Sequence, residues 1–181
     1  MKTVIPTPAI NGNMIGLTGR HGGGKTVTEH TITGNVFLAQ SGLPVFGKAF
    51  KLNPKTHLGM VFIDGVSGKS VIQVLVEKMK NVFKGIENVS GKNIVLVLDE
   101  LGSATQEKEG FELALKILEK IYNLKASLLF STQILDVARE AEKRFDAKCF
   151  KVDKQHKLIP GIAGGELQEL IKEAGLKKWL N

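Results

Sequence analysis

The residues with the clearest chemical potential are numbers 19–26, which read Gly-Arg-His-Gly-Gly-Gly-Lys-Thr. They match G-x-x-x-x-G-K-[ST] at every fixed position, a pattern whose backbone N–H groups converge on phosphate oxygens. A helix that begins at the end of such a loop directs its positive end at the same anion. Lys25 is then placed to reach the β- and γ-phosphates, and the Thr26 hydroxyl to ligate Mg²⁺. The pattern predicts a nucleoside triphosphate site built from Gly19, Gly22, Gly23, Gly24, Lys25 and Thr26.

Two adjacent acids after a strongly apolar segment form the second motif. Ile94–Leu98 is apolar throughout, which is typical of a strand covered on both faces, and Asp99 and Glu100 follow it directly. Such a strand carries its acids to the edge of the sheet where α/β proteins bind ligands. Asp99 is predicted to support Mg²⁺ opposite Thr26, and Glu100 to activate the water that attacks the γ-phosphate. The second acid favours hydrolysis over phosphoryl transfer to another substrate.

The segment after residue 60 holds one rival acid and one false match. Asp64 follows a strand candidate at 60–63, which makes it an alternative for the water-activating role, but Asp64-Gly65 is also an ordinary turn pair. Residues 65–70 end like a phosphate loop, yet the first required glycine would stand at Ile63. We expect a turn and a helix start at 65–70. Residues 91–93 match the pattern even less.

A third polar group follows the apolar segment 128–130, where the chain reads Ser131, Thr132, Gln133. The amide of Gln133 can donate and accept hydrogen bonds, so it can contact a γ-phosphate oxygen and the attacking water together. The alternative is that Gln133 caps the following helix or its loop. The sequence leaves both open.

Strands and helices alternate between these motifs. Apolar runs and alternation predict strands at 14–17, 45–52, 60–63, 94–98, 128–130, 149–152 and 158–159. Helical spacing predicts helices at 27–40, 70–83, 111–122, 135–143 and 166–174. This order predicts a three-layer α/β fold with a mostly parallel sheet and a C-terminal antiparallel hairpin. We expect one domain over residues 1–181, with a core at about 12–160 and a helical tail at about 161–181.

Composition points to an acidic partner and a reducing compartment. The chain has 25 basic and 18 acidic residues, a net charge of +7, and nucleic acid is the first partner to consider. The single cysteine, Cys149, lies in an apolar run and is expected to be a small buried hydrophobe, which fits the cytoplasm. No apolar run is long enough for a membrane span.

Taken together, the phosphate loop, the Asp-Glu strand and the strand ending Ser-Thr-Gln resemble the FtsK–HerA superfamily of DNA-pumping ATPases, over residues 12–160. The resemblance implies a RecA-like core in which the Gln133 strand lies between the strands of the phosphate loop and of Asp99. In its short length, the chain is similar to the genome-packaging ATPases of double-stranded DNA viruses with an internal membrane. The function so implied is an ATP- and Mg²⁺-dependent motor that moves double-stranded DNA into a preformed capsid, with Glu100 activating water and Gln133 sensing the γ-phosphate.

The resemblance also implies a ring, usually hexameric, and a capsid or portal protein as partner. In such a ring an arginine reaches the next subunit's site and neutralises transition-state charge. Arg144 is the first candidate for this role and Arg139 the second, while the position nearest the family's usual arginine is Lys148. A lysine supplies charge without the bidentate fork of an arginine.

DNA contact is assigned to the lysine-rich C-terminal part. Lys151, Lys154 and Lys157 flank or occupy the turn of the predicted hairpin and are suited to gripping phosphates, although a solvated surface is the simpler interpretation for any one lysine. Two other functions stay open: a P-loop ATPase of the replication or helicase-loading type, and an assembly switch gated by nucleotide without motor activity.

Overall fold

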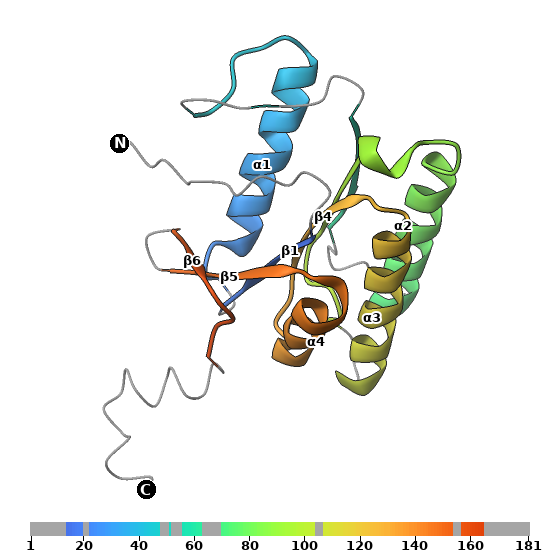
Figure 1. Cartoon of the computed structure of the whole chain (residues 1–181), viewed down its shortest axis with the longest axis vertical. Helices are drawn as coiled ribbons and strands as arrows, with labels where there is room; N and C mark the ends of the chain where they lie inside the picture. The colour runs from blue at the N-terminus through green and yellow to red at the C-terminus, as the bar shows by residue number, and fades with distance from the viewer. Residues whose placement is uncertain are drawn as a thin grey trace, which may run out of the picture.

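The computed structural model describes residues 14–19, 22–47, 51, 56–62, 70–103, 107–153 and 157–164. Six strands and four α-helices alternate along these residues (Figure 1). The strands are β1 (Met14–Thr18), β2 (His57–Val61), β3 (Ile94–Leu98), β4 (Ser127–Ser131), β5 (Lys148–Val152) and β6 (Leu158–Pro160). The helices are α1 (Lys25–Gln40), α2 (Val71–Gly85), α3 (Glu107–Asn123) and α4 (Leu135–Phe145), with a short 3₁₀ turn at Gly91–Asn93.

The strands form one sheet in the order β2-β3-β4-β1-β5-β6. All neighbours are parallel except β5 and β6, which are antiparallel. The carboxyl ends of parallel strands lie at the same edge, so the loops after β1, β3 and β4 meet there. The predicted fold class is therefore confirmed, including the C-terminal hairpin and the position of β4 between β1 and β3.

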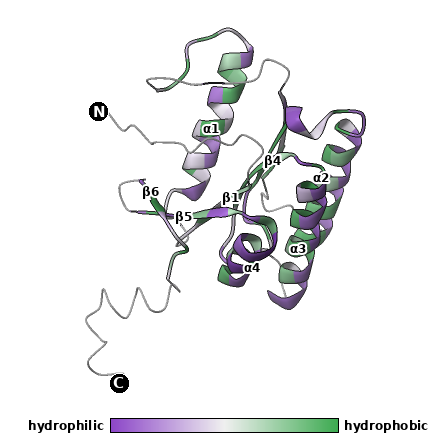
Figure 2. Ribbon diagram, in the orientation of Figure 1, coloured by the Kyte–Doolittle hydropathy of each residue, from purple (hydrophilic) through white to green (hydrophobic). Residues whose placement is uncertain are grey.

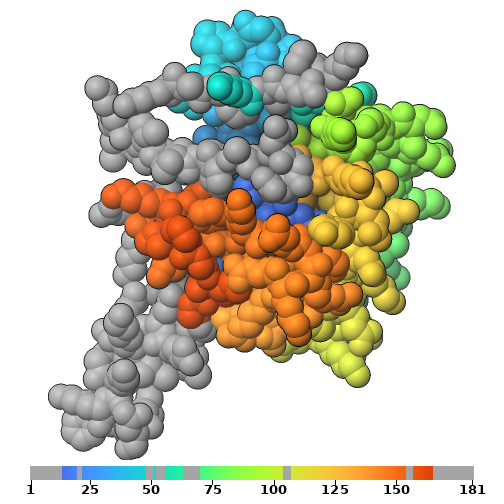
Figure 3. All heavy atoms as spheres, viewed as in Figure 1, coloured from blue at the N-terminus to red at the C-terminus, as the bar shows by residue number. Residues whose placement is uncertain are grey.

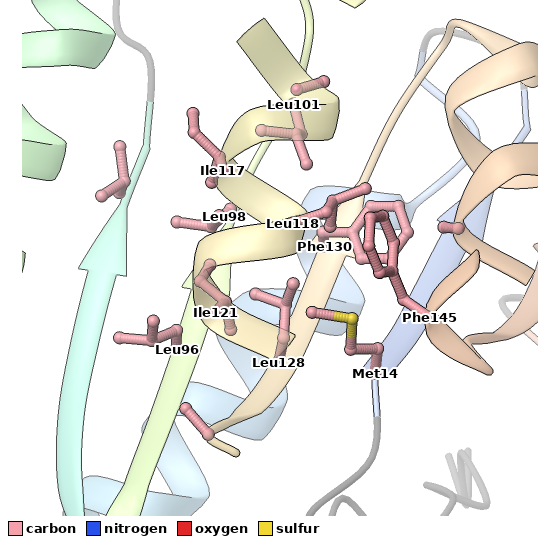
Figure 4. Packing of buried hydrophobic residues seen from close by; sticks show 14 of the residues in the cluster. Met14, Leu96, Leu98, Leu101, Ile117, Leu118, Ile121, Leu128, Phe130 and Phe145 are labelled. Atoms are coloured by element: carbon pink, nitrogen blue, oxygen red, sulfur yellow. The ribbon is translucent and has the colours of Figure 1, made fainter. Parts of the chain in front are cut away.

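Helices cover the two faces of the sheet unequally. Figure 1 shows α1 on one face and α2, α3 and α4 on the other. Alternate residues of each strand divide between these faces, as in β3, where Leu96 and Leu98 join the core under α2, α3 and α4 while Val97 packs with Ile32 of α1. Figure 4 shows the larger core, in which α3 contributes Ile117, Leu118 and Ile121.

The hydropathy of the residues agrees with a central sheet that helices cover on both faces (Figure 2). In Figure 2 the helices carry both hydrophilic and hydrophobic residues, whereas the central strands β1 and β4 are largely hydrophobic. Every residue of β1 and of β4 is buried. In the part of the chain that the structure describes, no helix combines the length and apolarity needed to cross a membrane.

Most predicted elements are present, and two need correction. The strand predicted at 45–52 is wrong for its described residues, because 45–47 and 51 lie outside any strand. The reason is visible at Phe46, whose N–H donates to Asn35 Oδ1 at 2.8 Å and whose carbonyl accepts from Asn35 Nδ2 at 2.9 Å. A side chain of α1 thus satisfies the backbone groups that a strand would use.

The strand predicted at 60–63 is observed as β2, which starts three residues earlier, at His57. Within the described part of the chain it is an edge strand that pairs with β3 alone, and four of its five residues are at least partly exposed. An edge strand needs no continuous apolar run, so the hydropathy pattern detects only the C-terminal end of β2. The helix predicted at 166–174, Lys154, and Asp64 all lie outside the described residues.

The two false matches to a phosphate loop have structural explanations. Ser70 is the N-cap of α2, since its hydroxyl accepts from the Gln73 N–H at 3.2 Å and the Gln73 side chain accepts from the Ser70 N–H at 3.1 Å. Gly91 opens the 3₁₀ turn, where a Cβ would lie 1.6 Å from the Leu124 carbonyl oxygen. Only glycine permits this approach of two backbone segments.

Cys149 behaves as a small core residue. It is 4% exposed on β5, and its thiol donates to the Ala138 carbonyl at 3.6 Å. Burial, with the nearby Glu142 carboxylate, raises the pKa of the thiol to about 12. The thiolate is therefore scarce at neutral pH, which suits a packing role rather than a reactive one.

Candidate nucleotide-binding and hydrolysis site

The loop between β1 and α1 has the backbone of an anion-binding turn. Gly22 and Gly24 have φ angles of 73° and 89°, in the left-handed region that favours glycine. Gly24 is the N-cap of α1, and no side chain among the described residues caps this helix start. The first-turn N–H groups are thus left for an anion at the positive end of the helix. Arg20 and His21 lie outside the described residues.

Lys25 lies at the first position of α1 and turns back over this loop. It is 5% exposed, and its Nζ donates to the carbonyl oxygen of Gly19 at 2.9 Å. The ammonium group is therefore held beside the loop whose N–H groups it would assist in binding phosphate. Contact of Lys25 with the β- and γ-phosphates stays a prediction, and the position of its ammonium group is compatible with that contact.

Thr26 and Asp99 meet across the carboxyl edge of the sheet. The Thr26 hydroxyl donates to Asp99 Oδ2 at 3.2 Å and lies 3.4 Å from Oδ1. Hydroxyl and carboxylate oxygens are the hard ligands that Mg²⁺ takes, usually with waters and substrate phosphates completing its octahedron. No group of three or more His, Cys, Asp or Glu capable of holding a metal occurs among the described residues. The hydroxyl of Thr26 and the carboxylate of Asp99 fit a magnesium ion that also binds nucleotide phosphates.

Ser131, the last residue of β4, joins the two acids. Its Oγ donates to Asp99 Oδ1 at 2.6 Å and accepts from the backbone N–H of Glu100 at 2.9 Å. One residue later, the Thr132 hydroxyl donates to the Leu101 carbonyl at 2.8 Å. These bonds fix the β3 and β4 ends to each other. This role of Ser131 was not predicted from the sequence, where the available signal is its place in the polar tip after a buried strand.

Glu100 and Gln133 are brought into direct contact. Gln133 Nε2 donates to Glu100 Oε1 at 2.9 Å. Glu100 has φ = 52°, a left-handed conformation that is uncommon for a residue with a side chain and recurs at functional sites. No side chain caps the start of α4, which does not support Gln133 as a helix cap, and the alternative that Gln133 caps the loop before this helix stays a prediction. The geometry is suited to a base and an amide that act on one water.

Glu29 is a site residue that the sequence analysis missed. It lies one turn after Lys25 on α1 and is 0% exposed. Burial, followed by the nearby Asp99 carboxylate, raises its carboxyl pKa to about 10 against the opposing effects of Ser131 and Lys25. The available signal was helical spacing, because Lys25, Glu29, Ile32 and Val36 share the buried side of α1.

The candidate arginines are not brought to the phosphate loop of their own chain. Since α4 starts after the carboxyl end of β4 and leads into the start of β5, its last turn, with Arg144, lies toward the opposite edge of the sheet. Arg144 lies over the Phe145 ring at 5.1 Å, and Arg139 pairs with Asp136 at 2.7 Å on the exposed face of α4. Lys148 is exposed at the start of β5. A finger role for any of them needs a second copy of the chain and stays a prediction.

The fold and the site together define a P-loop ATPase domain. A single-sheet α/β core carries a glycine-rich loop, a threonine facing an aspartate, and a glutamate beside a polar strand tip. A model of the family described as MutS domain V matches residues 15–162, so this chain belongs to the MutS domain V family.

Curated relatives agree with the family. The chain is 35% identical over 176 residues to "Endonuclease MutS2" of Lactococcus lactis subsp. cremoris, covering 91% of the chain and 22% of that protein. It is 29% identical over 178 residues to "Endonuclease MutS2" of Thermotoga neapolitana, and the match covers 90% of the chain and 22% of that protein. It is 28% identical over 196 residues to the protein of the same name in Bacillus cytotoxicus, and the match covers 98% of the chain and 24% of that protein. The chain thus spans less than a quarter of the length of these relatives.

These comparisons correct the expected family and function. The resemblance to the FtsK–HerA superfamily is wrong, and with it the expectation of a viral DNA-packaging motor. The hexameric ring and the capsid or portal partner depended on that resemblance and have no support. The physical reason is that the phosphate loop, the Asp-Glu pair and the polar strand tip are needed for ATP hydrolysis in general. These motifs indicate that ATP is hydrolysed, but they do not identify the family of proteins that uses the hydrolysis.

Proposed function

We propose that this chain binds and hydrolyses Mg²⁺-ATP to drive or gate a DNA-acting protein related to the MutS2 endonucleases. The observation that carries the proposal is one chain of hydrogen bonds from Thr26 through Asp99 and Ser131 to Glu100 and Gln133. It links the residues suited to holding a magnesium nucleotide with those suited to activating water. The endonuclease activity in the relatives' name is theirs, and it is no part of this proposal.

Each residue has one task in the proposed reaction. Lys25 and the loop N–H groups bind the phosphates, and Mg²⁺, held by Thr26 and Asp99, would neutralise phosphate charge. Glu100 accepts a proton from a water whose oxygen bonds to the γ-phosphorus, while the bond to the β–γ bridging oxygen breaks. Gln133 holds the Glu100 carboxylate through its 2.9 Å hydrogen bond and keeps the base oriented.

Duplex DNA is the proposed macromolecular partner. The net charge of +7 favours a polyanion, and Lys148, Lys151 and Lys157 are exposed on or beside β5. In Figure 3 the atoms of β5 and β6 form part of the surface at one side of the molecule. Lysines at such an edge are suited to contacting phosphates without reading bases.

The test is steady-state ATP hydrolysis with Mg²⁺, with and without long duplex DNA, for the wild type and Glu100→Gln. We expect the variant to bind ATP normally and to hydrolyse it roughly 10²- to 10⁴-fold more slowly, since a positioned base contributes about that much. Glu112→Gln, at an exposed position on α3, is the matched control. Stimulation by DNA that declines with salt supports the partner. Unchanged turnover in Glu100→Gln would contradict its role and make Asp64 the leading candidate.

A further inference from the structure

The amino edge of the sheet, opposite the candidate ATP site, holds a pocket that the proposed reaction leaves unused. Its volume is about 510 Å³, within the range of roughly 300–1,000 Å³ that small-molecule sites span. Met14, the first residue of β1, and Phe145, the last residue of α4, line it and are 4% and 5% exposed. Figure 4 shows these two side chains close together at one end of the larger core. The pocket therefore has an apolar floor that belongs to the core itself.

One wall of this pocket is a partly exposed aromatic ring. Tyr122, near the end of α3, packs against Phe145 with 5.6 Å between the ring centroids, yet 48% of the tyrosine remains exposed. A ring that is packed against the core and still half exposed offers a face on which a planar group can stack.

Basic side chains surround the pocket. Residues 91–93, 120–127 and 142–148, which are the 3₁₀ turn and the connections from the last turns of α3 and α4 to the next strands, hold six basic and two acidic residues. Their net charge of +4 is more than half of the +7 of the whole chain. Lys92 and Lys125 line the pocket, are exposed, and form no ion pair within the described part of the chain. This charge favours a polyanion as the ligand.

Two residues with a left-handed backbone end the helices at this pocket. Lys125 and Asp146 have φ angles of 55° and 52°, and both line it. Glycine or asparagine is the usual residue where a helix ends in this conformation. Among the described residues, the other non-glycine residue with a positive φ is Glu100 of the candidate ATP site. Such backbone outliers recur at functional sites, so the charged side chains at these two helix ends favour a ligand here.

We propose that this pocket binds an unpaired base of a single-stranded nucleic acid, with the base stacked on Tyr122 and the adjacent phosphates on Lys92 and Lys125. Proteins that bind single strands combine a basic surface with such aromatic rings. The Asp146 carboxylate in the same lining accepts hydrogen bonds, which suits the N–H groups of a base. A duplex keeps its base faces stacked on one another, so it can use the lysines but not the ring. The inference rests on the proposed partner, because it assumes that the polyanion is a nucleic acid, but it needs no ATP hydrolysis.

The test is binding of an end-labelled oligothymidylate to the full chain, followed by fluorescence anisotropy in EDTA without nucleotide. Tyr122→Leu removes the ring and keeps an apolar side chain, while Tyr122→Phe keeps the ring. Lys92→Gln combined with Lys125→Gln removes the charges of the pocket. Lys151→Gln combined with Lys157→Gln removes the same charge from exposed positions on and beside β5 and is the matched control. Because both pocket lysines are exposed, their double variant tests the site even if urea unfolding finds Tyr122→Leu unstable.

We expect Tyr122→Leu to weaken binding roughly 5- to 100-fold, as removal of one stacking contact does, and Tyr122→Phe to stay within about threefold of the wild type. The pocket double variant should weaken binding and lower the slope of log affinity against log salt by about 1.4, since each phosphate contact on a single strand contributes about 0.7. The β5 double variant should change neither quantity appreciably.

An unchanged affinity in a folded Tyr122→Leu, or in the pocket double variant, overturns the inference. An equal loss in the two double variants also overturns it, because net charge alone would then determine binding. Binding of duplex DNA without binding of the oligothymidylate overturns the inference and leaves the proposed function intact. Absence of binding to both nucleic acids overturns the proposed DNA partner and the inference together.

Discussion

The pH dependence of stability should reveal the buried acid on α1. In the folded protein the pKa of Glu29 is raised to about 10, against 4.5 for the ordinary carboxyl. Above pH 4.5 the unfolded chain releases this proton and the folded chain keeps it. The free energy of unfolding therefore decreases as pH rises, throughout the interval from about 4.5 to about 10. The stabilising contribution of a proton on Glu29 is complete below this interval and lost above it.

The magnitude follows from the slope of about 1.36 kcal/mol per pH unit for one proton. From pH 6 to pH 8, both inside the interval, the wild type should lose about 2.7 kcal/mol relative to a variant that cannot titrate at position 29. Glu29→Gln is that variant. Other groups titrate in this range as well, but they are shared by both proteins and cancel in the difference.

The assay is urea unfolding of the wild type and Glu29→Gln at pH 6, 7 and 8, without nucleotide or Mg²⁺. Glu119→Gln, at an exposed position on α3, controls for the loss of a carboxyl as such. The gap between wild type and Glu29→Gln should widen steadily with pH, and the gap for Glu119→Gln should not. Parallel curves for all three proteins would refute the reasoning, because Glu29 would then hold the same number of protons folded and unfolded.

Two further predictions test the framework around the site. Ser131→Ala removes the hydroxyl that bonds Asp99 at 2.6 Å and the Glu100 N–H at 2.9 Å, and we expect about 10- to 100-fold slower ATP hydrolysis in a steady-state assay, with a loss of about 1–3 kcal/mol in the free energy of unfolding. Normal turnover would show that Asp99 is held well enough without it. Gly91→Ala places a Cβ 1.6 Å from the Leu124 carbonyl oxygen and should destabilise the fold by about 2 kcal/mol or more in urea unfolding. A wild-type midpoint there would mean that the two backbone segments separate at little cost.

The parts of the fold that the sequence predicts well are those where burial is complete. The apolar run of β3 is observed with the predicted bounds, and β4 extends the predicted 128–130 by one residue at each end. The predicted strands are wrong or incomplete at exposed segments, where burial does not determine the backbone conformation. β2 is a half-exposed edge strand, and the segment near Phe46, itself 76% exposed, is held by the side chain of Asn35. Hydropathy carries no signal for a backbone bonded to a distant side chain.

The candidate site was predictable as a set of motifs but not as a connected structure. Spacing identifies the phosphate loop and the Asp-Glu pair, because the reaction demands those residue types in that order. It does not reveal that Ser131 lies between Asp99 and the Glu100 backbone, since that contact depends on β4 pairing beside β3. The same limit explains the wrong family: motifs that serve one reaction recur in many ATPases, whereas similarity along residues 15–162 distinguishes them.

Glu29 breaks the local rule that the buried side of a helix is apolar, and it does so beside the candidate site. On α1 it occupies the buried side with Ile32 and Val36, where an apolar residue would improve packing and remove the cost of an unpaired carboxyl. Sites where consistency between packing and sequence fails are expected to be functional. Here the buried carboxyl lies near Asp99, whose carboxylate accepts a hydrogen bond from Thr26. The unpaired carboxyl therefore lowers the free energy of unfolding relative to an apolar residue at the same position.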